Sequence, residues 1–255
     1  MPASRDSRQI DRSGTSFFNK WYKSMIELLE PWRWRDAKHS YAQAGEDLIV
    51  DFVVKAMQID EVTYLDIGAH HPIQFSNTYL FYKRGFQGVL VEPDPELMAS
   101  IRRVRPRDTC IEAGVGVQSA TEARFFVMST RTLNTFSEEE ANRYEAMGTQ
   151  RIEKVLPIPM VTLDQVLAER FRDKAPTLVS IDVEGLDFEV LSTLDLGKRR
   201  PPIICVETLQ YSETREEIKD TRIAQLMSDN DYFAYGDTYI NTIFVDRVRW
   251  KSSGK

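Results

Sequence analysis

The sequence is poor in cysteine and has no long apolar run. It holds 2 cysteines in 255 residues, Cys110 and Cys205, and each lies in a short apolar run that is typical of a buried strand. Two buried thiols indicate a reducing compartment rather than a disulfide. No apolar run approaches the ~20 residues of a membrane span, and the first sixteen residues lack the apolar core of a signal peptide. We therefore expect a cytoplasmic protein without a transmembrane segment.

An excess of basic residues is also lacking. The chain has 33 lysines and arginines against 39 acidic residues, a net charge of −6. Sequence-independent binding to nucleic acid needs a basic face that displaces counterions, so nucleic acid is not an expected partner. Small molecules or glycans are the expected partners instead. The length suits one domain with a short extension.

The N-terminal residues differ in pattern from the rest of the chain. Residues 1–16 are expected to be disordered. Residues 17–30 carry apolar side chains at helical spacing up to Pro31, which predicts a helix within an extension over 17–39. We expect this helix to pack on the domain or on a second copy of the chain, as in a homo-oligomer. Trp32 and Trp34 stand among basic residues, so contact with a membrane surface is the alternative.

Residues 40–255 have the pattern of an α/β domain. Short β-rich runs at 62–67, 88–92, 109–115, 177–182 and 202–207 alternate with helical or loop segments, which indicates a parallel sheet covered on both faces. The run "DYFAYGDTYINTIFVDR" predicts an antiparallel pair that closes the sheet. The expected fold is a Rossmann-like, doubly wound, mostly parallel seven-stranded sheet with a C-terminal antiparallel strand pair. Residues 124–160 are longer than a simple crossover and predict an extra strand, then a helix at 137–147, which together could wall a site.

Acidic residues follow four of the predicted strands. Asp66, Glu92, Asp182 with Glu184, and Glu207 stand at or just after strand ends. In open α/β sheets, ligands bind beyond the carboxyl ends of the strands. A single carboxylate there could simply cap the next helix, but four along one edge indicate a site.

The turn after the first strand lacks the glycines of a dinucleotide fingerprint. "YLDIGAHHP" has Gly68, but histidines and a proline stand where a pyrophosphate needs small residues. S-adenosylmethionine carries no phosphate. Asp66 beside the tight turn suits its ammonium group, and Glu92 can accept hydrogen bonds from both ribose hydroxyls. A nicotinamide-dependent enzyme would also use an acid at Glu92, so that alternative stays open at this point.

Longer stretches carry a family resemblance. "SYAQAGEDLIV", "YLDIGAHHPIQFSNTYLFYKRGFQGVLVEPDP", "VTLDQVL", "SIDVEGLDFEVL" and "IICVET" together resemble the FkbM-type methyltransferases, in the same order, over roughly residues 40–246. The resemblance implies a class I S-adenosylmethionine-dependent fold for 40–255. It places Asp66 and Gly68 on the cofactor turn, Glu92 on the ribose acid, and Asp182 and Glu184 on the "DVEG" signature. The family commonly has Ala-Asn or Ala-His after the first glycine, as in Ala69-His70 here.

The predicted cofactor contacts extend beyond these positions. The segment around Asn77 either caps the following helix, through Ser76, Asn77 or Thr78, or brings Asn77 into contact with cofactor or substrate. Ala113 and Val115 are expected to wall a flat adenine, with plain turn chemistry as the alternative. The full predicted set is Asp66, Gly68, Ala69, Asn77, Glu92, Ala113, Val115 and Asp182.

Methyl transfer to an alcohol needs an activated oxygen, supplied by a base or by a hard cation. Asp182 and Glu184 are the candidate catalytic carboxylates, and His70 is a further candidate base or substrate contact. Asp182, Glu184 and Glu207 would form the ligand set if Mg²⁺ is bound.

The sequence thus predicts an S-adenosylmethionine-dependent O-methyltransferase that acts on a hydroxyl of a small molecule or glycan, a substrate class implied by the resemblance alone. Two alternatives belong to other classes. One is a nicotinamide-dependent oxidoreductase or epimerase, which the missing glycines disfavour. The other is a catalytically inactive partner protein with a cofactor fold, which the presence of the four strand-end acids disfavours.

Overall fold

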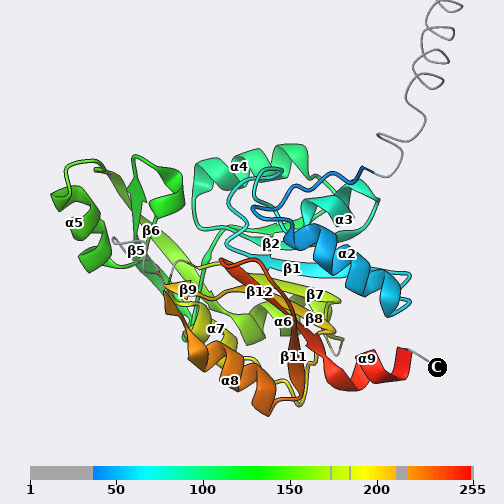
Figure 1. Ribbon diagram of the computed structural model, residues 1–255. Coiled ribbons are helices and arrows are strands. Elements are labelled where there is room, and N and C mark those ends of the chain that lie inside the picture. Colours follow the sequence, from blue (N-terminus) through cyan, green and yellow to red (C-terminus); the bar gives the residue numbers. More distant parts are fainter. Residues whose placement is uncertain (1–36, 173, 184, 211–217, 254–255) are drawn as a thin grey trace, which may run out of the picture. The chain divides into compact units, whose positions relative to one another are not determined.

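The structure is a computed structural model that describes residues 37–172, 174–183, 185–210 and 218–253 (Figure 1). The fold belongs to the unit Ser40–Lys255. The predictions for residues 1–16, for the helix at 17–30 with the two tryptophans after it, and for Glu184 fall outside the described residues. None of the helices in the described ranges has the length and apolar content of a membrane span.

Seven strands form the central sheet in the spatial order β11-β12-β8-β7-β1-β2-β3 (Figure 1). The strands from β3 to β8 pair in parallel, whereas β12 pairs antiparallel with β8 and with β11. This confirms the predicted fold class. The strand order reverses between β1 and β7, so the switch point of the sheet lies there. The bounds are β1 Thr63–Ile67, β2 Gln87–Val91, β3 Thr109–Ile111, β7 Leu178–Ile181, β8 Ile203–Glu207, β11 Tyr232–Asp237 and β12 Asn241–Asp246.

Helices cover both faces of this sheet (Figure 1). One face carries α2 (Glu46–Ala56), α3 (Tyr79–Lys83) and α4 (Pro95–Val104), and the other carries α6 (Leu163–Phe171), α7 (Asp187–Ser192) and α8 (Thr221–Asp229). A last helix, α9 (Arg247–Ser253), follows β12. Because successive strand residues point to opposite faces, β1 contributes to two cores. Tyr64 packs in the core under α2, α3 and α4, while Leu65 and Ile67 pack in the core under α6, α7 and α8.

A smaller sheet, in the order β4-β6-β5, follows β3. It consists of β4 (Gly114–Gly116), β5 (Ala120–Met128) and β6 (Ile152–Thr162), and a short 3-10 helix η1 (Arg131–Leu133) and α5 (Glu138–Ala146) lie between β5 and β6. The extra strand and the helix predicted in this segment are confirmed. The single strand predicted over 109–115 is wrong, because the chain leaves the central sheet after Ile111 and β4 pairs with β6 instead.

A two-stranded ladder completes the described fold. It pairs β9 (Leu209–Gln210) with β10 (Ile218–Lys219) in antiparallel fashion, directly after β8. The side chain of Lys219 donates to Asp237 on β11 and to Thr242 on β12, so this ladder is tied to the antiparallel end of the central sheet. The ladder therefore stands beside the carboxyl end of β8.

Candidate functional site

Backbone hydrogen bonds join the chain across the strand ends at the switch point. The amides of Gly68 and Ala69 both donate to the carbonyl of Val91, at 3.0 and 3.1 Å, and the amide of Asp182 donates to the carbonyl of Ile67 at 3.0 Å. The residues that follow β1, β2 and β7 therefore lie beside one another. This arrangement brings Asp66, Glu92 and Asp182 to one edge of the sheet, as the sequence predicted for adjacent parallel strands.

Gly68 is a position where only glycine fits. Its φ is +75°, a conformation that side chains with a Cβ rarely adopt, and a Cβ built there would stand 1.7 Å from the carbonyl oxygen of Asp182. The close approach results from the hydrogen bond that joins Asp182 to β1. Gly68 thus lets the turn after β1 pass directly against the strand end that carries Asp182.

Glu92 is a buried carboxylate that two backbone amides hold in place. Oε2 accepts from the amide of His70 and Oε1 from the amide of Asp94, both at 2.8 Å, and the residue is 4% exposed. Burial raises its pKa to about 7, although the two amide bonds oppose that shift. Each carboxylate oxygen keeps a further lone pair, so Glu92 is oriented to accept a second pair of hydrogen bonds, such as those of a ribose diol.

Asp66 belongs to a buried hydrogen-bond network instead of an open surface. It is 4% exposed, and its Oδ2 accepts from Thr78 Oγ1 at 2.5 Å and its carboxylate also accepts from Ser180. Burial raises the pKa of Asp66, and the nearby Arg105 cation lowers it. A direct contact between Asp66 and the ammonium group of a cofactor stays a prediction.

Asn77 does not cap the helix that follows it. Its Nδ2 donates to Ser180 Oγ at 3.1 Å, so it ties the loop after β1 to β7. The N-cap position of the helix is Thr78, and the amide of Tyr79 in the first turn donates to Ser76 Oγ at 3.1 Å. The capping alternative for Asn77 itself is therefore wrong, whereas a contact between Asn77 and cofactor or substrate remains a prediction.

The predicted apolar contacts lie in cores. Ala113 is 2% exposed and Val115 is 5% exposed, and both pack in the core under α6, α7 and α8. Ala69 is 7% exposed and packs on the opposite side, in the core with α2, α3 and α4. These side chains thus pack in the two cores on either face of the sheet. Adenine packing against them stays a prediction.

His70 follows the turn in a conformation rare for a residue with a side chain. Its φ is +47°. Within the described residues its Nε2 atom is buried and has no hydrogen-bond partner, and burial lowers the pKa of the ring. The neutral imidazole is therefore the main form at neutral pH, and it is able to accept a proton. His71 has a structural role instead, because its Nδ1 accepts from the amides of Ile73 and Gln74.

Asp182 forms a hydrogen bond with the carboxyl group of Glu207. Burial, with the charges of Asp66 and Glu46, raises the pKa of Asp182 to about 6, although the bond to Glu207 opposes the shift. Carboxyl groups that share a hydrogen bond titrate as a pair. The pair can therefore take up and release a proton close to neutral pH.

Asp187 was missed by the sequence analysis and shapes the segment after Asp182. It is 6% exposed and accepts from the amides of Val183 at 3.1 Å and Gly185 at 3.2 Å. Burial raises its pKa to about 7. An aspartate two residues after a glycine, at the start of a helix, was the available signal for such a turn.

A metal site is not assembled by the residues that the structure describes. Among them, no group of three histidine, cysteine, aspartate or glutamate side chains is arranged to hold an ion. The predicted ligand Glu184 lies outside these residues, so the Mg²⁺ set of Asp182, Glu184 and Glu207 stays a prediction.

The chain matches the model of the FkbM methyltransferase domain over residues 66–234, which is more than half of its length. The chain belongs to the FkbM family of methyltransferases. The matched segment begins at Asp66 and includes Glu92, Asp182 and Glu207, so the FkbM domain contains the whole strand-end site. No curated protein matches the chain.

Solved structures of methyltransferases are similar to this FkbM protein. The TehB-like SAM-dependent methyltransferase of Corynebacterium glutamicum is 8% identical with a TM-score of 0.39, over 92% of this chain and 100% of its own. The O-methyltransferase of Bacillus cereus, in complex with SAH, is 11% identical with a TM-score of 0.41, over 92% and 91%. The 1,6-didemethyltoxoflavin-N1-methyltransferase of Burkholderia thailandensis, with 1,6-didemethyltoxoflavin and S-adenosylhomocysteine bound, is 10% identical with a TM-score of 0.38, over 95% and 92%.

The segment of residues 124–160 is tied to the site through Asp94. Arg131 Nη1 and Asn134 Nδ2 both donate to Asp94 Oδ2, at 2.9 and 3.0 Å, while Asp94 Oδ1 caps α4 by accepting from the amide of Glu96. The amide of Asp94 also donates to Glu92, so residues 124–160 help to fix the carboxylate at the end of β2.

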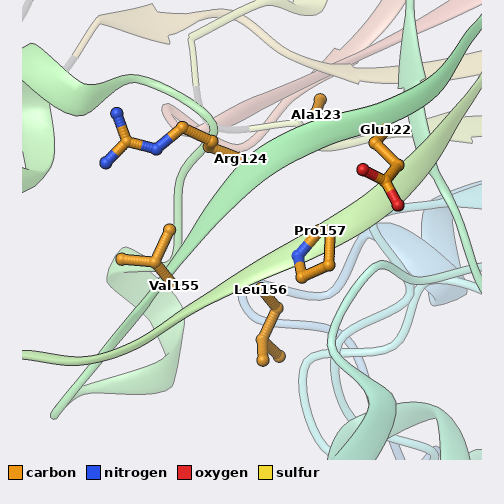
Figure 2. Close-up of a pocket in the computed structure, with 6 residues that line it drawn as sticks. All are labelled: Glu122, Ala123, Arg124, Val155, Leu156 and Pro157. Atoms are coloured by element: carbon orange, nitrogen blue, oxygen red, sulfur yellow. The ribbon is translucent and has the colours of Figure 1, made fainter.

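A hollow lies on the small sheet, on strands β5 and β6. Figure 2 shows its lining side chains on the antiparallel neighbours β5 and β6, with Glu122 and Arg124 on one and Val155 and Pro157 on the other. None of the predicted site residues lines it. The candidate site of this FkbM protein is therefore placed by the strand-end carboxylates and not by this hollow.

Proposed function

We propose that the protein is an S-adenosylmethionine-dependent O-methyltransferase that acts on a hydroxyl group of a small molecule or glycan, such as a sugar unit of a surface polysaccharide or of a secondary metabolite. The observation that carries the proposal is the position of Glu92 in the FkbM domain. Two backbone amides fix this buried carboxylate at the end of β2, next to the glycine turn. The paired carboxyl groups of Asp182 and Glu207 supply a base at the same edge.

The residues present fit the cofactor. When bound, S-adenosylmethionine supplies a methyl group on a positively charged sulfur. Glu92 has acceptor capacity for two ribose hydroxyls, and the Gly68 turn lies directly against the strand end that carries Asp182, so the turn and both acids share one edge. The acidic edge formed by Asp66, Asp182 and Glu207 suits a cationic ligand rather than a pyrophosphate. This charge also disfavours a nicotinamide dinucleotide.

The proton of the acceptor hydroxyl has two possible destinations at this edge. In the proposed reaction the acceptor oxygen bonds to the methyl carbon, the bond from that carbon to sulfur breaks with its electron pair left on sulfur, and the hydroxyl proton passes to the protein. The Asp182–Glu207 pair can take that proton, because burial raises the pKa of Asp182 to about 6, which is close to neutral pH. His70 Nε2 is neutral and without a partner among the described residues, so it is the second candidate.

Magnesium enters the proposal as an addition to be tested. Asp182 and Glu207, with Glu184, would hold the ion through carboxylate oxygens, and the ion would lower the pKa of the acceptor hydroxyl. An assay with and without Mg²⁺ separates this route from a carboxylate acting alone.

Methyl transfer from labelled S-adenosylmethionine to a panel of nucleotide sugars, oligosaccharides and phenolic alcohols tests the proposal. Asp182→Asn is expected to lower turnover by about 10²–10⁴-fold, the usual contribution of a general base, and to lower it by far more than it weakens binding of S-adenosylhomocysteine. The exposed Asp195, whose Oδ1 accepts from the amide of Gly197, provides the control variant Asp195→Asn with wild-type turnover. Label on nitrogen or carbon of the product would contradict O-methylation, and unchanged turnover in Asp182→Asn would remove this residue from the mechanism.

A further inference from the structure

Arg105 is a fully buried arginine between α4 and β3. Its side chain is 0% exposed, and it lies on the sheet face that carries α2, α3 and α4, over the rings of Tyr64 and Tyr82 at 5.5 and 5.2 Å. A buried cation is costly unless charged groups and hydrogen bonds compensate it. Its partners therefore indicate what it is there to hold.

The three nitrogens of Arg105 bind three different residues. Nε donates to Asp108 Oδ2 at 2.7 Å, Nη1 donates to Ser76 Oγ at 3.2 Å, and Nη2 donates to Thr78 Oγ1 at 3.0 Å. Asp108 is anchored in turn, because its Oδ1 accepts from Tyr64 Oη and from the amide of Gly88, both at 2.8 Å. Arg105 thus connects the fixed strands β1 and β2 to the loop that follows β1.

The loop contacts lead directly to the residues under the cofactor turn. Thr78 Oγ1 accepts from Arg105 and donates to Asp66 Oδ2 at 2.5 Å. Ser76 Oγ accepts from Arg105 and from the amide of Tyr79, which starts α3. The loop of residues 69–78, between β1 and α3, contains two non-glycine residues with positive φ, His70 and Phe75. It therefore needs support from other side chains to keep this conformation.

The planar fork of arginine suits this task in a way that lysine does not. Its donors lie in fixed directions and can bind three acceptors at once, whereas the ammonium of lysine is a compact charge on a flexible stem. A buried apolar side chain would fill the same volume without holding Ser76 or Thr78. The need for directed donors toward the loop explains why a cation occupies this position.

We propose that Arg105 is a positioning residue for cofactor binding, which holds the loop of residues 69–78 and the Asp66 carboxylate in the arrangement that the cofactor turn requires. The proposal rests on the function proposed above. Arg105 is buried beneath the turn and acts through Ser76, Thr78 and Asp66.

A readout in pH follows from the charges around Asp66. The charged and titratable groups that face it are Arg105 and Asp108 from the segment between α4 and β3, Asp182 after β7, and Cys205 on β8. Arg105 lowers the pKa of Asp66, whereas Asp108 and Asp182 oppose its ionisation. Without the cation, Asp66 becomes protonated at a higher pH. The loss of cofactor affinity on acidification then also begins at a higher pH.

The experiment compares Arg105→Lys and Arg105→Met with the same changes at Arg199. Arg199 is a matched control, since it is 5% exposed and pairs with Asp164 at 2.5 Å, but within the described residues its hydrogen bonds go to the two ends of α6, to Asp164 and to the carbonyl of Arg172. Each variant is titrated with S-adenosylhomocysteine at several pH values. Hydrogen exchange of the backbone amides of residues 69–79 is measured on the protein without cofactor. Thr78→Val removes only the hydroxyl that links Arg105 to Asp66, and it replaces the Arg105 variants in both measurements if those do not fold.

The expected result is at least tenfold weaker binding in both Arg105 variants and in Thr78→Val, with faster exchange at 69–79. Arg105→Met moves the acid loss of affinity to higher pH, Arg105→Lys keeps the wild-type pH profile, and the Arg199 variants change neither readout. Wild-type affinity and wild-type exchange in the Arg105 variants would overturn the proposal. Equal changes in the Arg199 variants would do so too, because they would show a general loss of stability. If the wild type itself does not bind, the proposed function fails and the role in cofactor binding with it, while exchange in the free protein still decides whether Arg105 holds the loop.

Discussion

Replacing Gly68 by alanine should damage both the stability of the domain and its cofactor site. A non-glycine residue in the left-handed region costs about 1–2 kcal/mol. The added Cβ would also stand 1.7 Å from the carbonyl oxygen of Asp182, so the strand ends must move by more than 1 Å to relieve the contact. Overpacking of this kind costs about 1–3 kcal/mol. The expected total of about 2–5 kcal/mol is a large part of the 5–15 kcal/mol typical of a domain.

A change at Gly148 separates the cost of backbone strain from the cost of the contact between the added Cβ and Asp182. Its φ is also +75°, but nothing lies within 4 Å of a Cβ built there, so Gly148→Ala introduces the backbone strain alone. Urea unfolding should therefore show Gly68→Ala less stable than Gly148→Ala by about 1–3 kcal/mol, a midpoint difference of about 0.3–1 M at an m-value near 3 kcal/mol/M.

Calorimetric titration with S-adenosylhomocysteine supplies the second readout for the same pair of variants. Gly148→Ala should bind like the wild type, because its turn lies after α5 and the added Cβ meets no described atom within 4 Å. Gly68→Ala should bind at least tenfold more weakly, since the turn after β1 and the end of β7 are displaced together. Equal midpoints for the two variants, with equal affinity, would refute the argument that the turn is packed against Asp182.

Three further predictions concern the strand-end carboxylates. Glu92→Gln should weaken binding of S-adenosylhomocysteine by about 1–3 kcal/mol in a calorimetric titration, because hydrogen bonds to a charged acceptor are replaced by bonds to a neutral one. Folding raises the pKa of Glu92 from 4.5 to about 7, so between pH 4.5 and pH 7 the folded protein binds one proton more than the unfolded chain. The stabilisation of the folded state by this proton is complete below pH 4.5 and is lost as the pH rises through 7. The unfolding free energy of the wild type should thus fall relative to Glu92→Gln by about 3 kcal/mol over that range, and parallel pH profiles would speak against it. Glu207→Gln should alter the acid limb of the pH–rate profile, because Asp182 loses its partner carboxyl group, and an unaltered limb would show that the pair does not set it.

The strand ends could be predicted because their signals are local. Apolar runs with an acid at the end mark both the strand and the edge where it stops, and parallel pairing then brings these ends together. Asp66, Glu92 and Asp182 follow from that rule. The split of the run 109–115 could not be predicted, because β4 leaves the central sheet to pair with β6, a strand about 46 residues later in the chain.

Strand β6 was also missed because of its prolines. Pro157 and Pro159 argue against a central strand. In the structure they lie where β6 pairs only with β5, since β4 pairs with β6 over Met160–Thr162 alone. On that stretch one side of β6 has no partner strand, so two missing amides are tolerated.

The support under the site is long-range and therefore has no local signal. Asn77 reaches Ser180 over 103 residues, and Arg105 reaches Thr78 over 27. An arginine next to Pro106 in a charged stretch gives no indication of complete burial. The sequence therefore indicated which carboxylates surround the site, whereas the residues that hold them in place could be found only in the structure.

Binding of S-adenosylmethionine through Glu92 at the carboxyl ends of β1, β2 and β7 can be decided by one calorimetric experiment. The purified protein is titrated with S-adenosylhomocysteine and, separately, with NAD⁺, each with and without Mg²⁺, with Glu92→Gln as the paired variant. We expect micromolar binding of S-adenosylhomocysteine, weaker binding in Glu92→Gln, and no binding of NAD⁺. Binding of NAD⁺ alone, or affinity for S-adenosylhomocysteine that is the same in Glu92→Gln, would contradict this expectation.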